Sequence, residues 1–374
     1  MKRVVCFCVV MCLLLVPLNV GAVSTSAKSA ILVNADTGEV IYEQNAREKL
    51  PMASTTKIMT ALLLCETGDM DKQITVKPEM VRVEGTSMGL LAGDKVSYKA
   101  LLYGMLLASG NDAANVTAYA LGGTIDGFVK MMNQKAEELG LKNTHFQTPS
   151  GLDGDEHYTT AEDLANLARV CMQNGLFAKA AASKTAVLEY GNPPYRRTLT
   201  NHNRLLKTFD GAIGVKTGFT KKSGRCLVSA AERGGKRVIA VTLKDPNDWA
   251  DHTALLNYGL EQIKTTEISP EIEEYSIPVI ASTEKSIELK IEDFTVNSLD
   301  GKGFSYKINI PRFLYAPIEK GEKIGDIVYL KNGEIIATKD ITAQKKIDKI
   351  SAKKDFKEEF KNCFKEIFTS IWEN

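Results

Sequence analysis

The sequence predicts an α+β fold: an antiparallel sheet that receives strands from both ends of a large domain, residues 23–264, and carries an inserted helical region. Three changes along the chain predict it. Two β-like segments near residue 30 are followed by several segments with helical spacing, and β-like segments return after residue 212. After residue 265, short alternating segments predict a small all-β domain, and the C-terminus has the period of an amphipathic helix. One sheet with a helical insertion fits this order of elements.

The first 22 residues have the layout of a secretory signal peptide. Lys2 and Arg3 precede an uncharged run over residues 4–16, and small residues follow at Val20-Gly21-Ala22. We therefore expect residues 1–22 to be removed on export; a buried N-terminal helix is the less favoured alternative, and the run is too short to span a membrane permanently. Loss of Lys2 and Arg3 takes the formal net charge from +1 to −1, so the exported protein has no electrostatic reason to bind nucleic acid.

The large domain begins with a β-hairpin, because two apolar runs, 30–34 and 39–43, flank the turn Asp36-Thr37-Gly38. Helical spacing then predicts helices over residues 54–66, 98–107, 113–121, 123–138 and 160–172. Thr159 and Glu162 have capping-box spacing at the start of the last of these helices. The sheet is expected to continue with β-like runs at residues 212–215, 226–231 and 237–243.

The small β domain is expected over residues 265–345 and the terminal helix over residues 350–374. Turns such as Asn332-Gly333 separate predicted strands, which carry no catalytic pattern, over residues 286–291, 304–310, 327–330 and 335–339. In the terminal helix the apolar side chains share one side: Phe356, Phe360, Cys363, Phe364, Ile367, Phe368, Ile371 and Trp372. Such a stripe favours attachment to a membrane interface. A packing helix or a self-associating coil is the alternative, since lysines and acids balance in this segment.

Three short motifs follow one another along the large domain: Ser54-Thr55-Thr56-Lys57, Ser109-Gly110-Asn111 and Lys216-Thr217-Gly218. Each motif alone is weak, and the first pattern also occurs at Ser282 to Lys285 and at Ser351 to Lys354. Their order and their wide separation, 55 and 107 residues, make coincidence improbable. Together they are typical of class A β-lactamases and penicillin-binding proteins.

Ser54 and Lys57 predict nucleophilic catalysis. They lie three residues apart on an expected helix, so their side chains share a face. A serine hydroxyl needs a base, no histidine has an obvious claim to that role, and Lys57 is placed for it. A lysine is protonated at neutral pH unless burial or a second positive charge lowers its pKa, and Lys216 is a candidate for that charge. The alternative is a helix cap at Ser54 beside an exposed Lys57.

The other two motifs predict a proton relay and substrate contacts. Ser109 would join the relay and the Asn111 amide would bind substrate, although both residue types also favour helix caps. Lys216 and Thr217 can bind a carboxylate, and Gly218 permits close approach of a ligand, although a plain strand-to-turn junction is the alternative. The four cysteines outside the signal peptide form no C-x-x-C pair, and no two histidines have metal-ligand spacing, so we expect no metal and no cofactor.

Longer stretches around these motifs carry a resemblance to a known family. They are residues 50–60 (Leu-Pro-Met-Ala-Ser-Thr-Thr-Lys-Ile-Met-Thr), 107–114, 214–220, and Thr148-Pro149-Ser150-Gly151-Leu152 with the segment 157–164 after it. The chain resembles a low-molecular-weight penicillin-binding protein of the D-alanyl-D-alanine carboxypeptidase family over nearly its whole length. The resemblance implies a β-lactamase/transpeptidase-like fold and an exported hydrolase of the bacterial cell wall, bound peripherally to the outer face of the membrane. It would trim the terminal D-alanine from peptidoglycan stem pentapeptides and be acylated by β-lactam antibiotics.

The resemblance also implies roles for the motif residues. Ser54 would form the acyl-enzyme with Lys57 as its base, Ser109 and Asn111 would complete the relay and position substrate, and Lys216, Thr217 and Gly218 would bind its carboxylate end. The backbone N–H groups of Ser54 and Phe219 would form the oxyanion hole. Some relatives have an arginine before the third motif that helps bind the carboxylate. The matching position here is His202, and nearby Arg204 is a possible substitute.

Three other functions stay open at this point. A β-lactamase would use the same acylation residues but needs a glutamate for deacylation, which we cannot identify in the sequence, and the β domain and terminal helix also argue against it. A DD-endopeptidase acting on cross-links would use the same serine chemistry. A catalytically silent wall-binding protein would have no reason to retain Ser54, Lys57 and Lys216.

Overall fold

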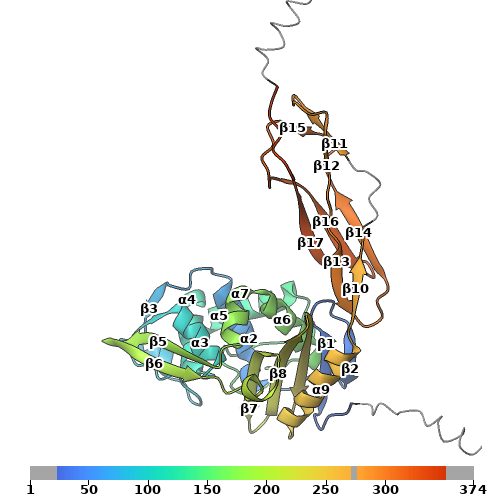
Figure 1. Cartoon of the computed structure of the whole chain (residues 1–374). Helices are drawn as coiled ribbons and strands as arrows, with labels where there is room; N and C mark the ends of the chain where they lie inside the picture. Colours follow the sequence, from blue (N-terminus) through green and yellow to red (C-terminus); the bar gives the residue numbers. More distant parts are fainter. Residues whose placement is uncertain (1–22, 271–275, 351–374) are drawn as a thin grey trace, which may run out of the picture. The chain divides into compact units, whose positions relative to one another are not determined.

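The computed structural model describes residues 23–270 and 276–350 (Figure 1). The predicted signal peptide, residues 1–22, and residues 351–374 of the predicted terminal helix lie outside the described residues. The chain divides into two compact units, the first ending at Ile263 and the second beginning at Lys264. Within the described residues, no helix is both long and apolar enough to cross a bilayer.

The first unit is built on a five-stranded antiparallel sheet with the order β2-β1-β9-β8-β7. Its strands come from both ends of the unit, as predicted: β1 Ser29–Asn34, β2 Val40–Gln44, β7 Ala212–Thr220, β8 Gly224–Arg233 and β9 Lys236–Leu243. The order places β7, the strand that carries the third motif, at one edge of the sheet. Alternate N–H groups of an edge strand point away from the sheet and remain available to a ligand.

The two faces of this sheet pack against different helices. Successive side chains of β1 point to opposite faces. Ile31 and Val33 belong to the large core shared with the helical region, whereas Leu32 contacts Gly259 of helix α9 (Asp248–Gln262). All three are buried. The unbroken apolar run of β1, residues 30–33, is therefore explained by a sheet that is covered on both faces.

The helical region lies between β2 and β7 in the sequence, as predicted. It contains η2 Ala53–Thr56, α2 Lys57–Cys65, η3 Pro78–Val81, α3 Tyr98–Leu106, α4 Asn111–Gly122, α5 Ile125–Glu138, α6 Ala161–Gln173, α7 Gly175–Ala181 and α8 Leu205–Thr208. Every residue of α2 is buried, so the helix that carries Lys57 runs through the core. The predicted capping box at Thr159 is wrong by one residue: Thr160 caps α6, and its hydroxyl accepts from the Asp163 backbone N–H.

A second sheet of the first unit was not predicted. Its order is β3-β4-β5-β6, with strands at Gln73–Thr75, Lys95–Ser97, Thr185–Gly191 and Pro194–Thr200. The two shorter strands offer too few residues for an alternating pattern. The other two form a hairpin around Asn192 and Pro193, where prolines obscure the strand signal.

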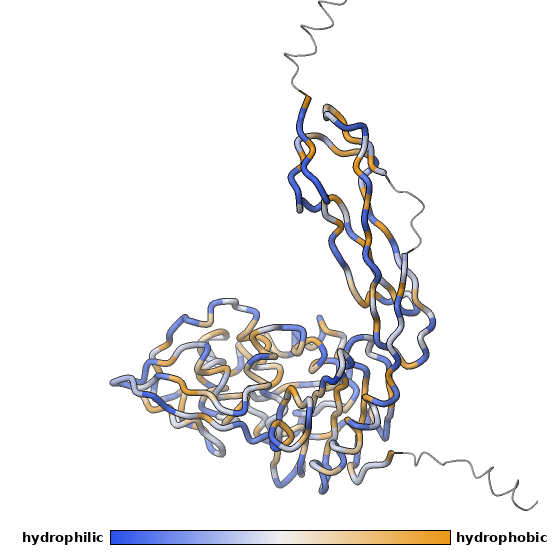
Figure 2. The backbone as a smooth tube through the Cα atoms, viewed as in Figure 1, coloured by the Kyte–Doolittle hydropathy of each residue, from blue (hydrophilic) through white to orange (hydrophobic). Residues whose placement is uncertain are grey.

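The second unit is all-β, as predicted, and Figure 2 shows hydrophobic and hydrophilic residues alternating along its strands. Its described residues, 264–270 and 276–350, form three small sheets, β10-β13, β12-β11-β15 and β14-β16-β17. The strands are β10 Lys264–Ile268, β11 Ser276–Ile280, β12 Ser286–Glu288, β13 Phe294–Ser298, β14 Phe304–Asn309, β15 Leu314–Tyr315, β16 Lys323–Lys331 and β17 Glu334–Thr342. The Phe294 ring stacks on Tyr329 at 4.1 Å in the core. The predicted strand over residues 286–291 ends early, at Glu288, whereas β16 and β17 are longer than predicted.

Candidate active site

The structure brings Ser54 and Lys57 together at the junction of η2 and α2. The Lys57 Nζ atom lies 2.8 Å from Ser54 Oγ. Lys57 is fully buried, and its Nζ also donates to the Asn111 side-chain oxygen at 2.7 Å and to the Ser150 backbone oxygen at 2.6 Å. A neutral lysine amine has two N–H bonds and one lone pair. Asn111 and Ser150 occupy the two N–H bonds, which leaves the lone pair for the Ser54 hydroxyl.

The surroundings of Lys57 favour this neutral form. Burial lowers the pKa of Lys57 well below its usual value of 10.5, and the positive charge of Lys216 lowers it further. The negative charge of Asp112 raises the pKa of Lys57, but this effect is smaller than the other two. The Asp112 carboxylate is itself held by the backbone N–H groups of Met88 and Leu90. Lys57 therefore has the properties of a base that can accept the Ser54 proton at neutral pH.

The second motif lies in the turn between α3 and α4. Ser109 Oγ accepts a hydrogen bond from Lys216 Nζ at 3.0 Å, so the structure connects this hydroxyl to the third motif. Asn111 is the first residue of α4, and its amide donates to the Glu84 backbone oxygen at 2.7 Å. Both ends of the Asn111 amide are thus engaged within the protein. Its contact with Lys57 fixes the orientation of the lysine.

The third motif lies on the edge strand β7, directly beside the nucleophile. Lys216 is buried, and burial lowers its pKa to about 7. A Cβ on Gly218 would lie only 3.1 Å from the Ser54 backbone nitrogen and 3.2 Å from the Met52 oxygen. Glycine is therefore needed for β7 to approach η2 this closely. The next residue, Phe219, is 67% exposed at the rim.

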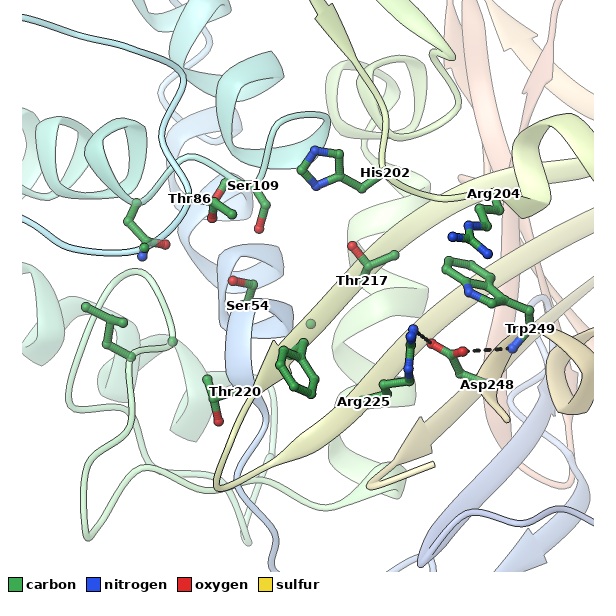
Figure 3. A pocket seen from close by; sticks show the side chains of 16 residues that line it. Ser54, Thr86, Ser109, His202, Arg204, Thr217, Thr220, Arg225, Asp248 and Trp249 are labelled. Atoms are coloured by element: carbon green, nitrogen blue, oxygen red, sulfur yellow. Dashed lines mark hydrogen bonds and ion pairs between the residues drawn. The ribbon is translucent and has the colours of Figure 1, made fainter. Parts of the chain in front are cut away.

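An open cleft of about 400 Å³ runs past these residues. In Figure 3, Thr217 lies between Ser54 on one side and Arg204, Trp249 and Asp248 on the other. Arg225 forms an ion pair with Asp248 at 3.6 Å. The residues that line the cleft are Ser54, Gly85, Thr86, Ser109, Asn111, Gly151, Leu152, His202, Arg204, Thr217, Gly218, Phe219, Thr220, Arg225, Asp248 and Trp249.

Both candidates for carboxylate recognition, His202 and Arg204, line the cleft. His202 is exposed at the cleft, and partial desolvation of its ring and the charge of Lys216 lower its pKa, so it is a neutral donor at most. Arg204 lies over the Trp249 ring, 5.8 Å from the ring centre to the guanidinium carbon. Arg204 therefore stays a candidate for the carboxylate contact, as does His202; Arg225, which also lines the cleft, is paired with Asp248.

Sequence reasoning missed the loop that supports Lys57. Ser150 provides a backbone acceptor to Lys57, and the Thr60 hydroxyl donates to the Pro149 oxygen at 2.6 Å. Gly151 has φ +88°, and a Cβ there would lie 1.9 Å from the Ala53 oxygen. The segment Thr148-Pro149-Ser150-Gly151-Leu152 entered the analysis only through resemblance, because a backbone oxygen leaves no signal in residue types.

His157 links the segment that precedes this loop to η2 through hydrogen bonds of both its ring nitrogens. The Gln147 N–H donates to His157 Nδ1 at 2.9 Å, so the ring proton is on Nε2, which donates to the Thr56 hydroxyl at 2.8 Å. Burial lowers the pKa of His157 to about 4. His157 is therefore neutral at physiological pH and is a positioning residue for the segment that precedes Lys57.

Protonation of His157 is expected to destabilise the fold at low pH. Its pKa is about 4 in the folded protein against 6.5 in the unfolded chain. The stability that the neutral ring contributes is therefore complete above pH 6.5 and is lost as pH falls toward 4, by about 3 kcal/mol. Denaturant unfolding between pH 4 and 8 measures this loss. A His157→Asn variant should lack this part of the pH dependence; an unchanged difference between wild type and variant across the range would contradict the assignment.

Comparisons with known proteins find related families for both units of the chain. Residues 18–247 match the family described as D-alanyl-D-alanine carboxypeptidase, and residues 268–349 match the family described as penicillin-binding protein 5, C-terminal domain. The chain is 34% identical over 338 residues to the D-alanyl-D-alanine carboxypeptidase DacF of Bacillus subtilis, covering 86% of both chains. It is 31% identical over 351 residues to DacC of Escherichia coli, covering 88% of this chain and 86% of the relative.

Two solved structures extend the likeness. The D-alanyl-D-alanine carboxypeptidase DacD from Francisella tularensis is 28% identical, with a TM-score of 0.63 over 88% of this chain and 95% of the other. The Streptomyces K15 DD-transpeptidase is 33% identical, with a TM-score of 0.61 over 64% of this chain and 98% of the other. The first likeness spans both units, and the second covers a length close to that of the first unit alone.

Proposed function

Because this chain belongs to the D-alanyl-D-alanine carboxypeptidase family of serine-type peptidases, we propose that it removes the terminal D-alanine from peptidoglycan stem pentapeptides through an acyl-enzyme on Ser54. One observation carries the assignment of residues: a buried lysine with a lowered pKa lies 2.8 Å from an accessible serine hydroxyl. Family membership favours this activity over a β-lactamase or an endopeptidase. A serine with a base already in contact argues against a silent binding protein.

In the acylation step, Lys57 accepts the Ser54 proton while Oγ attacks the carbonyl carbon between the two D-alanines. The carbonyl oxygen becomes an oxyanion, and the backbone N–H groups of Ser54 and Phe219 are its proposed donors. The close approach of Gly218 to the Ser54 nitrogen supports this, because it brings the edge of β7 alongside η2. The C–N bond then breaks, the leaving amine takes a proton, and D-alanine departs.

Ser109 is the proposed route for that proton. The Ser109 hydroxyl accepts a hydrogen bond from Lys216 and faces the cleft. The Thr86 hydroxyl donates to the Ser109 backbone oxygen and thereby stabilises the turn. Deacylation repeats the chemistry with water as the nucleophile and Lys57 as the base. The ester bond to Ser54 breaks, and the stem peptide leaves with a new carboxylate.

The carboxylate of the terminal D-alanine would bind on the Thr217 side of Ser54. The Thr217 hydroxyl provides a donor there, Lys216 the nearest buried positive charge, and Arg204 the charge at the far end of the cleft. The same groups would hold the carboxylate of a β-lactam, whose strained amide presents its carbonyl to Ser54. Acylation by penicillin follows from this arrangement.

Hydrolysis of a peptide ending in Lys-D-Ala-D-Ala tests the proposed function. We expect rapid release of D-alanine from the free acid and little release of D-alanine amide from the matched C-terminal amide, because the amide lacks the charge that Lys216 and Arg204 would recognise. Equal rates on the two peptides would refute the carboxylate contact. A folded protein that releases no D-alanine from the free acid would refute the proposed function.

We also propose that the protein is exported by its signal peptide and held at the outer face of the membrane by residues 350–374. The apolar stripe of this segment supports the proposal. Deleting residues 352–374 is expected to move the protein from the membrane pellet to the soluble fraction with D-alanine release intact, since the hydrophobic cores of both units lie within the remaining residues. Fractionation of cells that express either form measures it, and a truncated protein that still pellets would contradict it.

A further inference from the structure

An exposed apolar surface lies on β11 and β15 of the second unit. It consists of Pro278, Ile280, Phe313 and Tyr315, which we call the aromatic patch. Ile280 is 43%, Phe313 46% and Tyr315 66% exposed. The two rings lie perpendicular with their centres 5.5 Å apart, and Ile280 is the register partner of Tyr315. These side chains therefore form one continuous surface.

The strand pattern makes this surface unusual. Ile277 and Val279 alternate with the exposed positions of β11 and are buried in the core of the unit. The outer face of such a half-buried sheet is ordinarily polar. Here the face is polar on the β12 side, at Ser276, Ser286 and Glu288, but apolar and aromatic on the β15 side, which indicates that the β15 side binds something.

The chain leaves the described structure directly beside this patch. The Ile350 N–H donates to the Ala281 oxygen at 3.0 Å, next to Ile280. Residues 351–355 separate this point from Phe356, the first apolar residue of the terminal stripe. Five residues span at most about 18 Å, so any surface that binds the stripe is within reach of the patch. Attachment of the stripe gives even a weak second contact a high effective concentration.

We propose that the aromatic patch contacts the lipid headgroup region of the membrane as a second attachment point, beside the terminal segment. This rests on the proposed attachment of residues 350–374. Tyrosine and other aromatic rings favour the interface between lipid and water. Arg312 precedes Phe313 in the chain, and Lys349 pairs with Ser282, two residues after Ile280; both are exposed, and their charges suit anionic lipid headgroups.

The other possible occupant is the terminal segment itself. Its stripe has eight apolar side chains against four in the patch, so folding back would leave much of the stripe uncovered. A lipid surface accommodates both at once. Two weak attachments also fix the orientation of the second unit at the membrane, which a single attachment does not.

Partition of the full mature chain into vesicles of phosphatidylcholine and phosphatidylglycerol tests the proposal. We expect the double variant F313S/Y315S to show about a tenfold lower partition coefficient, because two rings no longer leave water. The matched control is Ile335→Ser: Ile335 is 68% exposed on β17 of the same unit, in a different sheet. D-alanine release should be unchanged in both variants, because the active site lies in the first unit. Far-UV circular dichroism and denaturant unfolding show whether the second unit of each variant is folded.

The outcomes separate the two proposals. If F313S/Y315S binds as tightly as wild type while deletion of residues 352–374 abolishes binding, the patch proposal alone is wrong. Tighter binding by F313S/Y315S would show that the patch covers the terminal segment, and it also overturns the proposal. Equal weakening by Ile335→Ser would mean a general loss of apolar surface and would overturn it as well. A wild-type chain that does not bind vesicles would refute both attachments.

Discussion

Replacing Ser54 by alanine is expected to abolish both D-alanine release and penicillin acylation. The hydroxyl is the atom that forms the ester, and Lys57 has no other hydroxyl among its hydrogen-bond partners. We expect kcat to fall by at least about 10⁴-fold, as is typical when a serine nucleophile is removed. D-alanine release gives the rate, and mass spectrometry of the intact protein after benzylpenicillin treatment gives the adduct.

The chain provides a matched control for this variant. Ser282 begins a second S-x-x-K sequence, which lies in the β-rich second unit, where its hydroxyl bonds to the Glu284 oxygen. Ser282→Ala should leave both readouts at wild-type values. A penicillin adduct that persists in Ser54→Ala would place the nucleophile elsewhere and refute the assigned mechanism.

Replacing Lys57 by arginine is expected to lower kcat by at least about 10³-fold, because a permanent cation takes the place of a neutral base. An arginine stays protonated at any pH at which the protein is folded, so it has no lone pair for the Ser54 proton. Lys216→Arg is the informative comparison. There the proposed role is that of a cation, which arginine fulfils, so we expect a smaller loss that appears mainly in KM.

The pH dependence gives these variants a second readout. In wild type, kcat/KM should rise with pH as Lys57 loses its proton and fall again as Lys216, with its pKa near 7, loses its own. Because the two lysines interact, the apparent pKa values of the rising and falling parts of the pH profile describe the pair and cannot each be assigned to one lysine. Substantial turnover by Lys57→Arg would contradict the assignment of Lys57 as the base. A loss of kcat in Lys216→Arg as large as that in Lys57→Arg would contradict it as well.

The sequence predicted the elements whose periodicity is strong and local. The sheet built from both ends and the buried α2 follow from runs of alternating or helically spaced apolar residues. The hairpin of β5 and β6 escaped because its turn contains Pro193 and Pro194 and its strands are partly exposed. Thr159 was mistaken for the cap of α6 because Thr160, one residue later, is equally suited to the position.

The candidate site was predictable where function depends on side-chain type at short spacing. Ser54 and Lys57 are three residues apart, and their contact follows from a helical turn. The link from Lys57 to Asn111 joins residues 54 positions apart, and the link to Ser150 ends on a backbone atom. Arg225, Asp248 and Trp249 enter the cleft only because β8 pairs with β7 and α9 packs against β8. Such contacts are fixed by tertiary packing and leave no pattern in the sequence.

The burial of Lys57 behind Ser54 also decides which bond the enzyme makes. A neutral amine is intrinsically a better nucleophile than a hydroxyl, and an acyl group transferred to it would form an amide. Lys57 does not line the cleft, whereas Ser54 does, so the substrate carbonyl meets oxygen and not nitrogen. The product is an ester, which water can cleave. Burial of the Lys57 amine thus ensures that the enzyme is regenerated after each cycle. It also prevents the substrate from acylating the lysine permanently.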